Sequence, residues 1–472
     1  MNKSKELAKN TIILTIGKIC TQFVSFMLLP LYTALLNPEE FGVVDLFNTY
    51  VNLLVPLFNW QFENGLFRYL IDVRTDKNKV RRLFSTVFIT NLFQIVISCV
   101  IYVIVQRFIS SEYRIFLLID IVLSIIQCTL LQFPRGLGEN IKFAFSSFLS
   151  ASSAVFFNII FIAGFGMGAY GMFFSIVIAK LISIAYLSIS NKIWMYLSFK
   201  LFDKECFKEL CKYSFPLIPN SFSWWVVGAS DRTIVSAFLG IAVNGVYSVA
   251  NKFSSILVIF YNIFNMSWTE TVSLHINDED NEQFMEQTIN SIFNLFSCLI
   301  IGVIACMPFV FPIMVNRQYD DAYYQIPILM VSILFQIVVG LYSVIYVALK
   351  KSVEIAKTSF YAAVINVVVD VLFVRFIGLY AASISTLVAY VTMAVYRYFH
   401  VKKYVNIPLK SSTIVFTTII ATITVATYYY RNWVMCLISL IIVVIYSFLV
   451  NIELIKRIMN TLFSHIKKRR NG

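Results

Sequence analysis

Apolar stretches of about 20 residues recur along the whole 472-residue chain. At 1.5 Å per residue, a helix of that length crosses a hydrocarbon core of about 30 Å. Only 13% of the residues are charged, about half the share typical of soluble domains. In lipid, backbone polar groups must be satisfied within the segment, and the uniform apolar runs lack the two-residue alternation of barrel strands. The sequence therefore predicts an all-α polytopic membrane protein.

Hydropathy windows place about 14 transmembrane helices along the chain. The first stretch is too long for the apolar region of a signal peptide and ends without a cleavage site, so we expect it to remain as a span. The predicted spans lie near residues 9–36, 42–66, 83–106, 115–134, 143–164, 167–190, 212–239, 244–268, 288–314, 326–348, 357–376, 379–399, 411–430 and 432–454.

The basic residues are distributed very unevenly between the two sets of loops. With a cytoplasmic N-terminus, 29 of the 38 lysines and arginines lie in cytoplasmic segments, 5 lie in outer loops and 4 lie within spans. Cytoplasmic loops characteristically carry this excess. We therefore expect both termini in the cytoplasm. The net charge of +13 then reflects membrane orientation and not binding to nucleic acid.

An internal repeat divides the spans into two groups. A shift of 203 residues places Gly42 on Gly245 and Asn48 on Asn251, so spans 1 and 2 correspond to spans 7 and 8. A second echo aligns spans 5 and 6 with spans 11 and 12. Two six-helix lobes in parallel orientation are related by a pseudo-twofold axis along the membrane normal, with the ligand path between them. The expected parts are residues 1–190, a cytoplasmic linker 191–211, residues 212–403, spans 13 and 14 within 404–455, and a basic tail 456–472.

Spans 13 and 14 stand outside this duplication. In a transporter they could serve a lipid tail, and they are equally compatible with a purely structural role. The sequence leaves these two alternatives open.

Polar side chains follow one face of several spans. In span 2 they fall at spacings of three, four and seven residues, which places them along one helical face. A shared water-filled cavity between lobes requires such faces, and hydrogen bonding within a dry core is the alternative. The predicted cavity lining is Gln22, Asp45, Asn48, Asn52, Asn59, Asp231, Ser248, Asn251, Ser255 and Asn262.

Four cations lie within predicted spans, where exposure to lipid would cost about 2.5 to 3.5 kcal/mol each. They are Lys18, Lys180, Arg232 and Lys252. We expect them to face protein or water and to form a cationic interior that binds an anionic ligand. An ion pair between Asp231 and Lys252 is an alternative for that lysine. Asp45 and Asp370 are candidates for coupling to H+ or Na+, and structural pairing is equally compatible with them.

The residue patterns of catalysis are missing from the sequence. Its eight cysteines are scattered without a CxxC pair, and its three histidines lie in loops or the tail. The chain has no Walker A sequence, and its loops are too short for a catalytic domain. We expect a transporter and not an enzyme, with no catalytic residues, metal or cofactor, driven by ions or by the ligand gradient.

Several segments resemble the polysaccharide repeat-unit flippases (Wzx type) of the multidrug/oligosaccharidyl-lipid/polysaccharide exporter superfamily. The resemblance covers nearly the full length. The segments that carry it are Ala8–Thr11, Leu29–Tyr32, Glu40–Leu46, Phe67–Tyr69, Asp231–Val235, Phe238–Gly240, Gly245–Ser248, Asn366, and Gly378–Ser383. It implies a two-lobed carrier of the bacterial inner membrane that flips undecaprenyl-diphosphate-linked oligosaccharides by alternating access, for O-antigen, lipopolysaccharide or other surface polysaccharide synthesis.

The resemblance also defines partners and alternatives. The implied ligands are the lipid-linked oligosaccharide and membrane lipids, with a polysaccharide polymerase and a chain-length regulator as further partners. An ion-coupled drug or metabolite antiporter of the same superfamily is the main alternative. A lipid II flippase and a membrane glycan polymerase are the others. Related lipid II flippases often use arginine in span 1, where this chain has Lys18.

Overall fold

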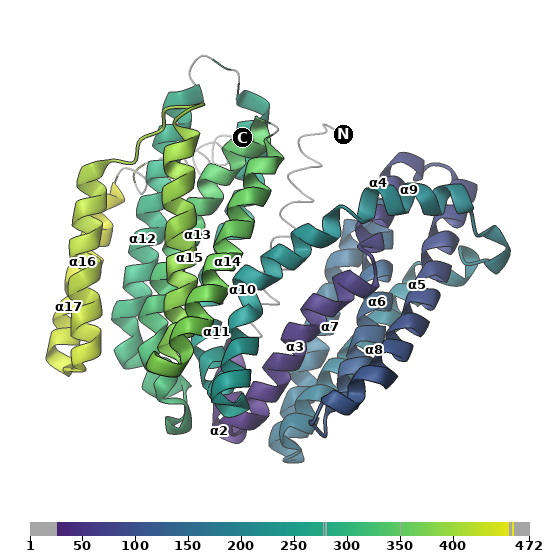
Figure 1. Ribbon diagram of the computed structural model, residues 1–472, viewed down its shortest axis with the longest axis horizontal. Coiled ribbons are helices and arrows are strands. Elements are labelled where there is room, and N and C mark those ends of the chain that lie inside the picture. Colours follow the sequence, from purple (N-terminus) through teal and green to yellow (C-terminus); the bar gives the residue numbers. More distant parts are fainter. Residues whose placement is uncertain (1–25, 277, 279–280, 350, 453–455, 457–472) are drawn as a thin grey trace, which may run out of the picture. The chain divides into compact units, whose positions relative to one another are not determined.

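A computed structural model describes residues 26–276, 278, 281–349, 351–452 and 456. Within these ranges the regular secondary structure is entirely helical (Figure 1), which confirms the predicted all-α fold. Eleven of the described helices are long and apolar enough to cross a membrane. Their long apolar runs permit no other arrangement that satisfies the backbone in lipid.

Each predicted span from the second onward coincides with a helix or a helix pair. The first span lies largely outside the described residues, and α2 is its end. The helices are α2 Leu29–Leu35, α3 Pro38–Phe58, α4 Phe62–Val73, α5 Lys77–Val105, α6 Arg114–Gly136, α7 Asn140–Asn158 with a π-helical continuation Ile159–Gly164, α8 Gly168–Ser190, α9 Lys204–Ser214, α10 Leu217–Leu239, α11 Ile241–His275, α12 Asn281–Met314, α13 Asp321–Ala348, α14 Ser352–Ile377, α15 Tyr380–Val401, α16 Ser411–Tyr430 and α17 Trp433–Val450.

The chain forms two compact units, Met1–Val249 and Ala250–Gly472. The boundary between these units falls inside α11, whereas the internal repeat places a boundary at 191–211. The difference arises because α10 and the first turns of α11 pack against α3. A division by contacts within the fold does not test a division by sequence repeat. The two lobes that the repeat predicts therefore stay a prediction.

The predicted second span is interrupted in the structure. It begins at α3 with a capping box, in which Asn37 and Glu40 exchange hydrogen bonds. It stops after Phe58, and α4 resumes at Phe62. Trp60 and Gln61 adopt left-handed backbone conformations, with φ of 53° and 58°. Residues without glycine's freedom seldom adopt these angles. The hydropathy windows did not predict this break, because they average the polar residues at 59, 61, 63 and 64 with the apolar residues around them.

In the first unit, α5, α6 and α8 pack around α3 and α4, and α7 packs on α8 and α6. The buried core includes Phe62, Phe84 and Phe133 from α4, α5 and α6. The rings of Phe84 and Phe133 lie 4.7 Å apart. Figure 1 shows α7 and α8 running side by side, and Ser146 and Ser183 hydrogen bond between them at 2.9 Å. These contacts form a bundle against which α3 and α4 are held.

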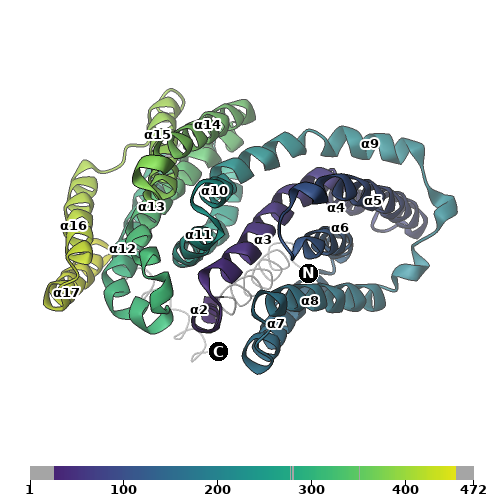
Figure 2. The same ribbon diagram turned by 60° about the horizontal axis from the view of Figure 1, so that its bottom comes forward.

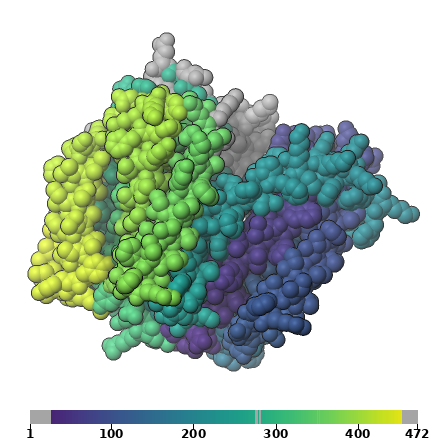
Figure 3. Space-filling model, in the orientation of Figure 1, coloured from purple at the N-terminus to yellow at the C-terminus, as the bar shows by residue number. Residues whose placement is uncertain are grey.

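In the second unit, α16 and α17 form a hairpin that packs on α12 (Figure 2) and occupies one edge of that unit (Figure 3). Stacked Tyr323 and Tyr428 rings, 4.1 Å apart, join the hairpin to α13. An apolar cavity of about 650 Å³ lies between α16 and the helices α12, α13 and α15. Phe293, Phe335 and Ala426 are among its lining residues.

Candidate functional site

Two glycines bring α3 and α11 into close backbone contact. A Cβ atom at Gly42 would lie 2.2 Å from the Ile241 carbonyl oxygen, and one at Gly245 would lie 1.9 Å from the Pro38 carbonyl oxygen. The Asn244 side chain donates a hydrogen bond to the Gly42 carbonyl at 3.1 Å. Only glycine permits this approach, and it places the first turn of α11 beside the polar face of α3.

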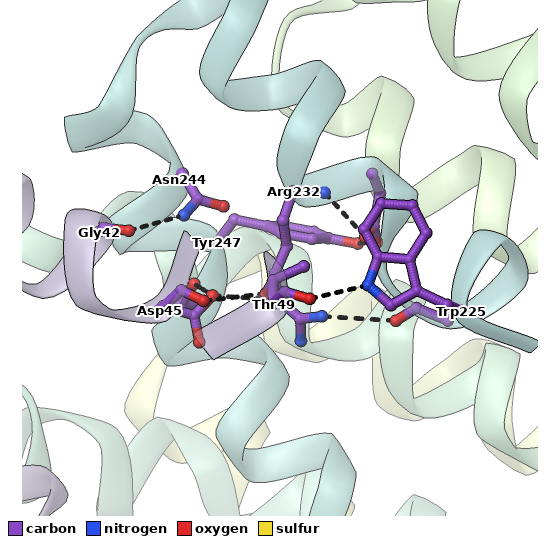
Figure 4. Close-up of polar contacts among 10 residues, drawn as sticks. Gly42, Asp45, Thr49, Trp225, Arg232, Asn244 and Tyr247 are labelled. Atoms are coloured by element: carbon purple, nitrogen blue, oxygen red, sulfur yellow. Dashed lines mark hydrogen bonds and ion pairs between the residues drawn. The ribbon is translucent and has the colours of Figure 1, made fainter. Parts of the chain in front are cut away.

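Asp45 is the centre of the polar site on α3 (Figure 4). Its Oδ2 atom lies 3.1 Å from Nε of Arg232 on α10 and accepts a hydrogen bond of 2.5 Å from the Ser248 hydroxyl on α11. The Asp45 and Arg232 side chains are only 16% and 19% exposed. One carboxylate thus joins three helices within the first unit, and its pairing with arginine stabilises both charges.

Neighbouring groups form further contacts of α10 with α11 and α3. Asp231 is buried, accepts a hydrogen bond of 2.5 Å from Tyr247 and accepts another from the Arg232 backbone amide. The Trp225 indole donates to the Thr49 carbonyl at 2.9 Å. These bonds connect α10 to α11 and to α3 in addition to the Asp45–Arg232 ion pair.

Positions related by the internal repeat meet at this site. Gly42 aligns with Gly245, and Asp45 aligns with Ser248, both at an offset of 203 residues. The backbones of the first pair touch, and the side chains of the second pair are hydrogen bonded. The polar stripes that the sequence places on spans 2 and 8 therefore contact each other at their N-terminal ends.

The remaining residues of the two polar stripes have mixed surroundings. On the first stripe, Asn48 is half-buried and Asn52 is exposed. Asn59 is fully buried at the helix break. On the second stripe, Asn251 is half-buried, whereas Ser255 and Asn262 are exposed. Their assignment to a cavity lining stays a prediction.

The other predicted cations differ in their surroundings. Lys18 and Gln22 lie outside the described residues. Lys180 pairs with Asp120 and donates to the Ser124 hydroxyl at 2.7 Å. Lys252 is half-buried on α11. Two of the four predicted cations therefore have carboxylate partners within the first unit, and their role in binding a ligand stays a prediction.

The two residues proposed for ion coupling lie in different units. Asp45 belongs to the three-helix site of the first unit. Asp370 is fully buried on α14 in the second unit. Its neighbour one turn earlier, Asn366, lies within hydrogen-bonding distance of Ser385 and Thr386 on α15. A coupling role for either aspartate stays a prediction.

Asp120 and Arg397 are among the charged residues that the sequence reasoning overlooked. Asp120 lies in span 4 with Ser124 four residues later on the same face, a pattern that predicts a polar partner for Lys180. Arg397 was counted with a cytoplasmic loop, but in the structure it is fully buried on α15. Its guanidinium donates to Thr358 at 2.7 Å and to the Val339 carbonyl at 3.3 Å. Because Arg397 lies near the end of an apolar run, the sequence did not predict that it is buried.

The fold resembles those of known membrane transporters. The lipid II flippase MurJ in an inward closed conformation has a TM-score of 0.68 at 15% identity, covering 94% of this chain and 100% of that one. An inward-facing multidrug resistance MATE family transporter of the MOP superfamily has a TM-score of 0.63 at 12% identity, covering 81% and 95%. A variant of the Vibrio cholerae MATE transporter VcmN has a TM-score of 0.57 at 13% identity, covering 84% and 96%.

These likenesses, with the many apolar helices, define the class of the protein as an integral membrane protein with the fold of MOP-superfamily transporters and flippases. The chain belongs to the polysaccharide biosynthesis protein family, whose sequence profile matches residues 7–269, more than half of its length. A search of curated protein sequences finds no match. The predicted relationship to membrane proteins of polysaccharide synthesis is thereby confirmed, and the narrower repeat-unit (Wzx type) assignment stays a prediction.

Proposed function

We propose that the protein flips undecaprenyl-diphosphate-linked oligosaccharide repeat units from the cytoplasmic to the outer leaflet of the bacterial cytoplasmic membrane. Alternating access would deliver them for surface polysaccharide synthesis. Membership of a polysaccharide biosynthesis family and the transporter fold support this proposal. The protein acts as a carrier, without a covalent step or cofactor, and supplies a membrane polymerase and its chain-length regulator.

The ion pair between Asp45 and Arg232 is the observation that carries the proposal. Arg232 holds its guanidinium beside one carboxylate oxygen, 3.1 Å away, at a partly exposed position. A diphosphate presents more anionic oxygens than a carboxylate and accepts two parallel hydrogen bonds from a guanidinium. Cargo arrival therefore exchanges the Asp45 carboxylate for the diphosphate as the partner of Arg232.

This exchange links cargo binding to a helix contact. Once Arg232 turns to the diphosphate, Asp45 keeps its hydrogen bond from Ser248 but no longer joins α3 to α10. A ligand shifts a conformational equilibrium only through different interactions with its two states. The loss of this ion pair on binding supplies such a difference.

The test is export of surface glycan by a deletion strain that carries Arg232→Ala. We expect full-length protein, at least about a tenfold loss of surface glycan, equivalent to about 1.4 kcal/mol, and accumulation of lipid-linked repeat units on the cytoplasmic side. Arg232→Lys keeps the charge and loses the planar fork, so its export should be intermediate. Lys18→Ala tests the second proposed phosphate ligand in the same assay.

Arg68→Ala is the matched control, because Arg68 forms an exposed ion pair with Asp72 at 2.8 Å. Exposed ion pairs contribute about 0 to 1 kcal/mol, so export should remain normal. Normal glycan from Arg232→Ala would contradict the site. Drug sensitivity of the deletion strain with normal glycan would favour an antiporter, loss of cell-wall synthesis would favour a lipid II flippase, and chain elongation by the purified protein would favour a polymerase.

A further inference from the structure

The break between α3 and α4 holds a cluster of polar side chains that the proposed diphosphate site does not include. Trp60 and Gln61 both have left-handed backbone angles, and each such residue costs about 1 to 3 kcal/mol where the surroundings impose it. Gln61 is 4% exposed, and Asn59 is fully buried. A strained, polar and buried interruption of a long apolar helix favours a specific role for this segment.

Glu63 places a carboxylate in this cluster. Asn59 donates to its Oε2 atom at 2.6 Å, and Asn64 donates to its Oε1 atom at 3.2 Å. In the part of the chain that the structure describes, no lysine or arginine forms an ion pair with Glu63. The Cys128 thiol on α6, a neutral group, interacts electrostatically with it. The Glu63 carboxylate thus has neutral partners and no counter-charge in that part of the chain. Burying an ionised carboxylate without a counter-charge costs free energy.

Two buried amide oxygens at the break have no hydrogen-bond donor among the residues that the structure describes. They are Oδ1 of Asn59 and Oε1 of Gln94, in side chains that are 0% and 1% exposed. The Gln94 amide nitrogen donates to the Asn59 carbonyl at 3.2 Å, so both amides lie at the C-terminal end of α3. Each unsatisfied buried acceptor costs about 1 to 3 kcal/mol. Within the described residues, acceptors without donors at the same helix break as a carboxylate without a counter-charge form a site that suits a cation.

We propose that Glu63, Asn59 and Gln94 bind a small monovalent cation, Na+ or a proton, at the helix break. Carboxylate and amide oxygens are the ligands that hard cations prefer. A proton would neutralise the same carboxylate, and the carboxylic acid would donate to an amide oxygen. Both ions supply the positive charge that the cluster lacks.

Hydrogen bonds connect this site to the helix that carries Arg232. The Asn64 side-chain nitrogen donates hydrogen bonds to both Glu63 and the Gln61 amide oxygen, the second at 2.5 Å. Gln61 in turn donates to the Ser221 hydroxyl on α10 at 2.8 Å. A bound cation would compete with Asn64 for the Glu63 oxygens. The hydrogen bonds from Asn64 to Gln61 and from Gln61 to α10 would change as a result. This coupling rests on the proposed function, whereas cation binding does not.

The experiment measures thermal unfolding of the purified full-length protein in detergent without cargo. One arm titrates Na+ at constant ionic strength with K+, and the other varies pH at fixed salt. For Na+, we expect a rise in Tm with concentration in wild type and an apparent affinity at least about tenfold lower in Glu63→Gln. For a proton, Tm should rise as pH falls in wild type, and Glu63→Gln should lose this rise.

Glu205→Gln is the matched control, because Glu205 is exposed on α9 and the chemical change is identical. Glu63→Asp keeps the carboxylate and should retain weakened binding, which keeps the proposal testable if Glu63→Gln fails to fold. Equal responses of wild type and Glu63→Gln in both arms would overturn the site. Because the assay contains no cargo, that result would leave the flippase proposal intact, and normal glycan from Arg232→Ala would leave the cation site intact.

Discussion

At the scale of single residues, Gly42 and Gly245 determine how closely α3 and α11 approach. Their missing side chains allow Asn244 to reach the Gly42 carbonyl and Ser248 to reach Asp45. The polar site therefore depends on two residues that bear no functional group. A change at either one should affect the site through backbone separation.

Gly42→Ala tests this dependence. The new methyl group would lie 2.2 Å from the Ile241 carbonyl oxygen, and backbone on both sides leaves no flexible side chain to yield. We expect destabilisation of about 1 to 3 kcal/mol, as for other overpacked sites. Thermal unfolding in detergent measures the loss of stability, and glycan export measures the loss of function. Gly302→Ala on α12, where a Cβ meets nothing within 4 Å, should leave both unchanged. Equal Tm values for the two variants would contradict the role of Gly42.

Charged residues show which parts of the candidate site could be predicted from the sequence. The cost of burial identified Arg232 and Lys180 as residues that need a polar environment, and both have one. Their partners were harder to predict because Asp45 and Asp120 lie 187 and 60 residues away in the chain. Glu63 also escaped attention, because a hydropathy window averages a single carboxylate inside the predicted span 42–66 with the apolar residues around it. Arg232 and Lys180 are distant from their partners in the sequence and become their neighbours only in the folded structure.

At the scale of helices, Arg397 connects α13, α14 and α15. Its guanidinium bonds Ser343 and the Val339 carbonyl on α13, and Thr358 on α14. A fully buried cation with hydroxyl and carbonyl partners provides directional contacts between helices that apolar packing lacks. Within the second unit, this residue specifies how three helices are arranged.

Arg397→Leu removes those contacts and should lower the unfolding free energy by at least about 2 kcal/mol, since hydrogen bonds to charged groups contribute about 1.5 to 3 kcal/mol each. Arg397→Lys keeps the charge but has a single nitrogen, so its Tm should fall between those of wild type and Arg397→Leu. Arg114→Leu, at an exposed position on α6, is the control. A wild-type melting temperature for Arg397→Leu would show that apolar packing alone arranges these helices.

The cavity beside α16 allows a test of the two roles proposed for α16 and α17, which are binding of a lipid tail and a purely structural role. It is apolar and has a volume of about 650 Å³, which suits part of a prenyl chain. Ala426→Trp would add bulk to the cavity lining, and Ile423→Trp places the same bulk on another exposed position of α16 that does not line the cavity. If a lipid tail occupies the cavity, Ala426→Trp should reduce glycan export several-fold at normal protein level, and Ile423→Trp should not. Equal export by the two variants would favour a purely structural hairpin.

At the scale of the whole molecule, the sequence predicts what depends on apolar length and periodicity. Helix after helix coincides with a predicted span, because the bilayer sets the length of each one. The interruption at Trp60 and the unit boundary inside α11 depend on contacts between distant segments, and hydropathy contains no information on them. The helices α10 and α15 are absent from the eleven apolar spans because they carry Arg232 and Arg397 among other polar residues.

Orientation in the membrane is a whole-molecule property that the basic residues predict. Alkaline phosphatase is active only outside the cytoplasm, and green fluorescent protein exported through the general secretory route does not fluoresce. We expect an active phosphatase fused after Ser110, between α5 and α6, and fluorescent protein fused after Lys200, between α8 and α9, or at the C-terminus. The opposite pattern would reverse the proposed direction of translocation. It would leave the helices themselves unaffected, because apolar length forms them and the 29 to 5 charge distribution only orients them.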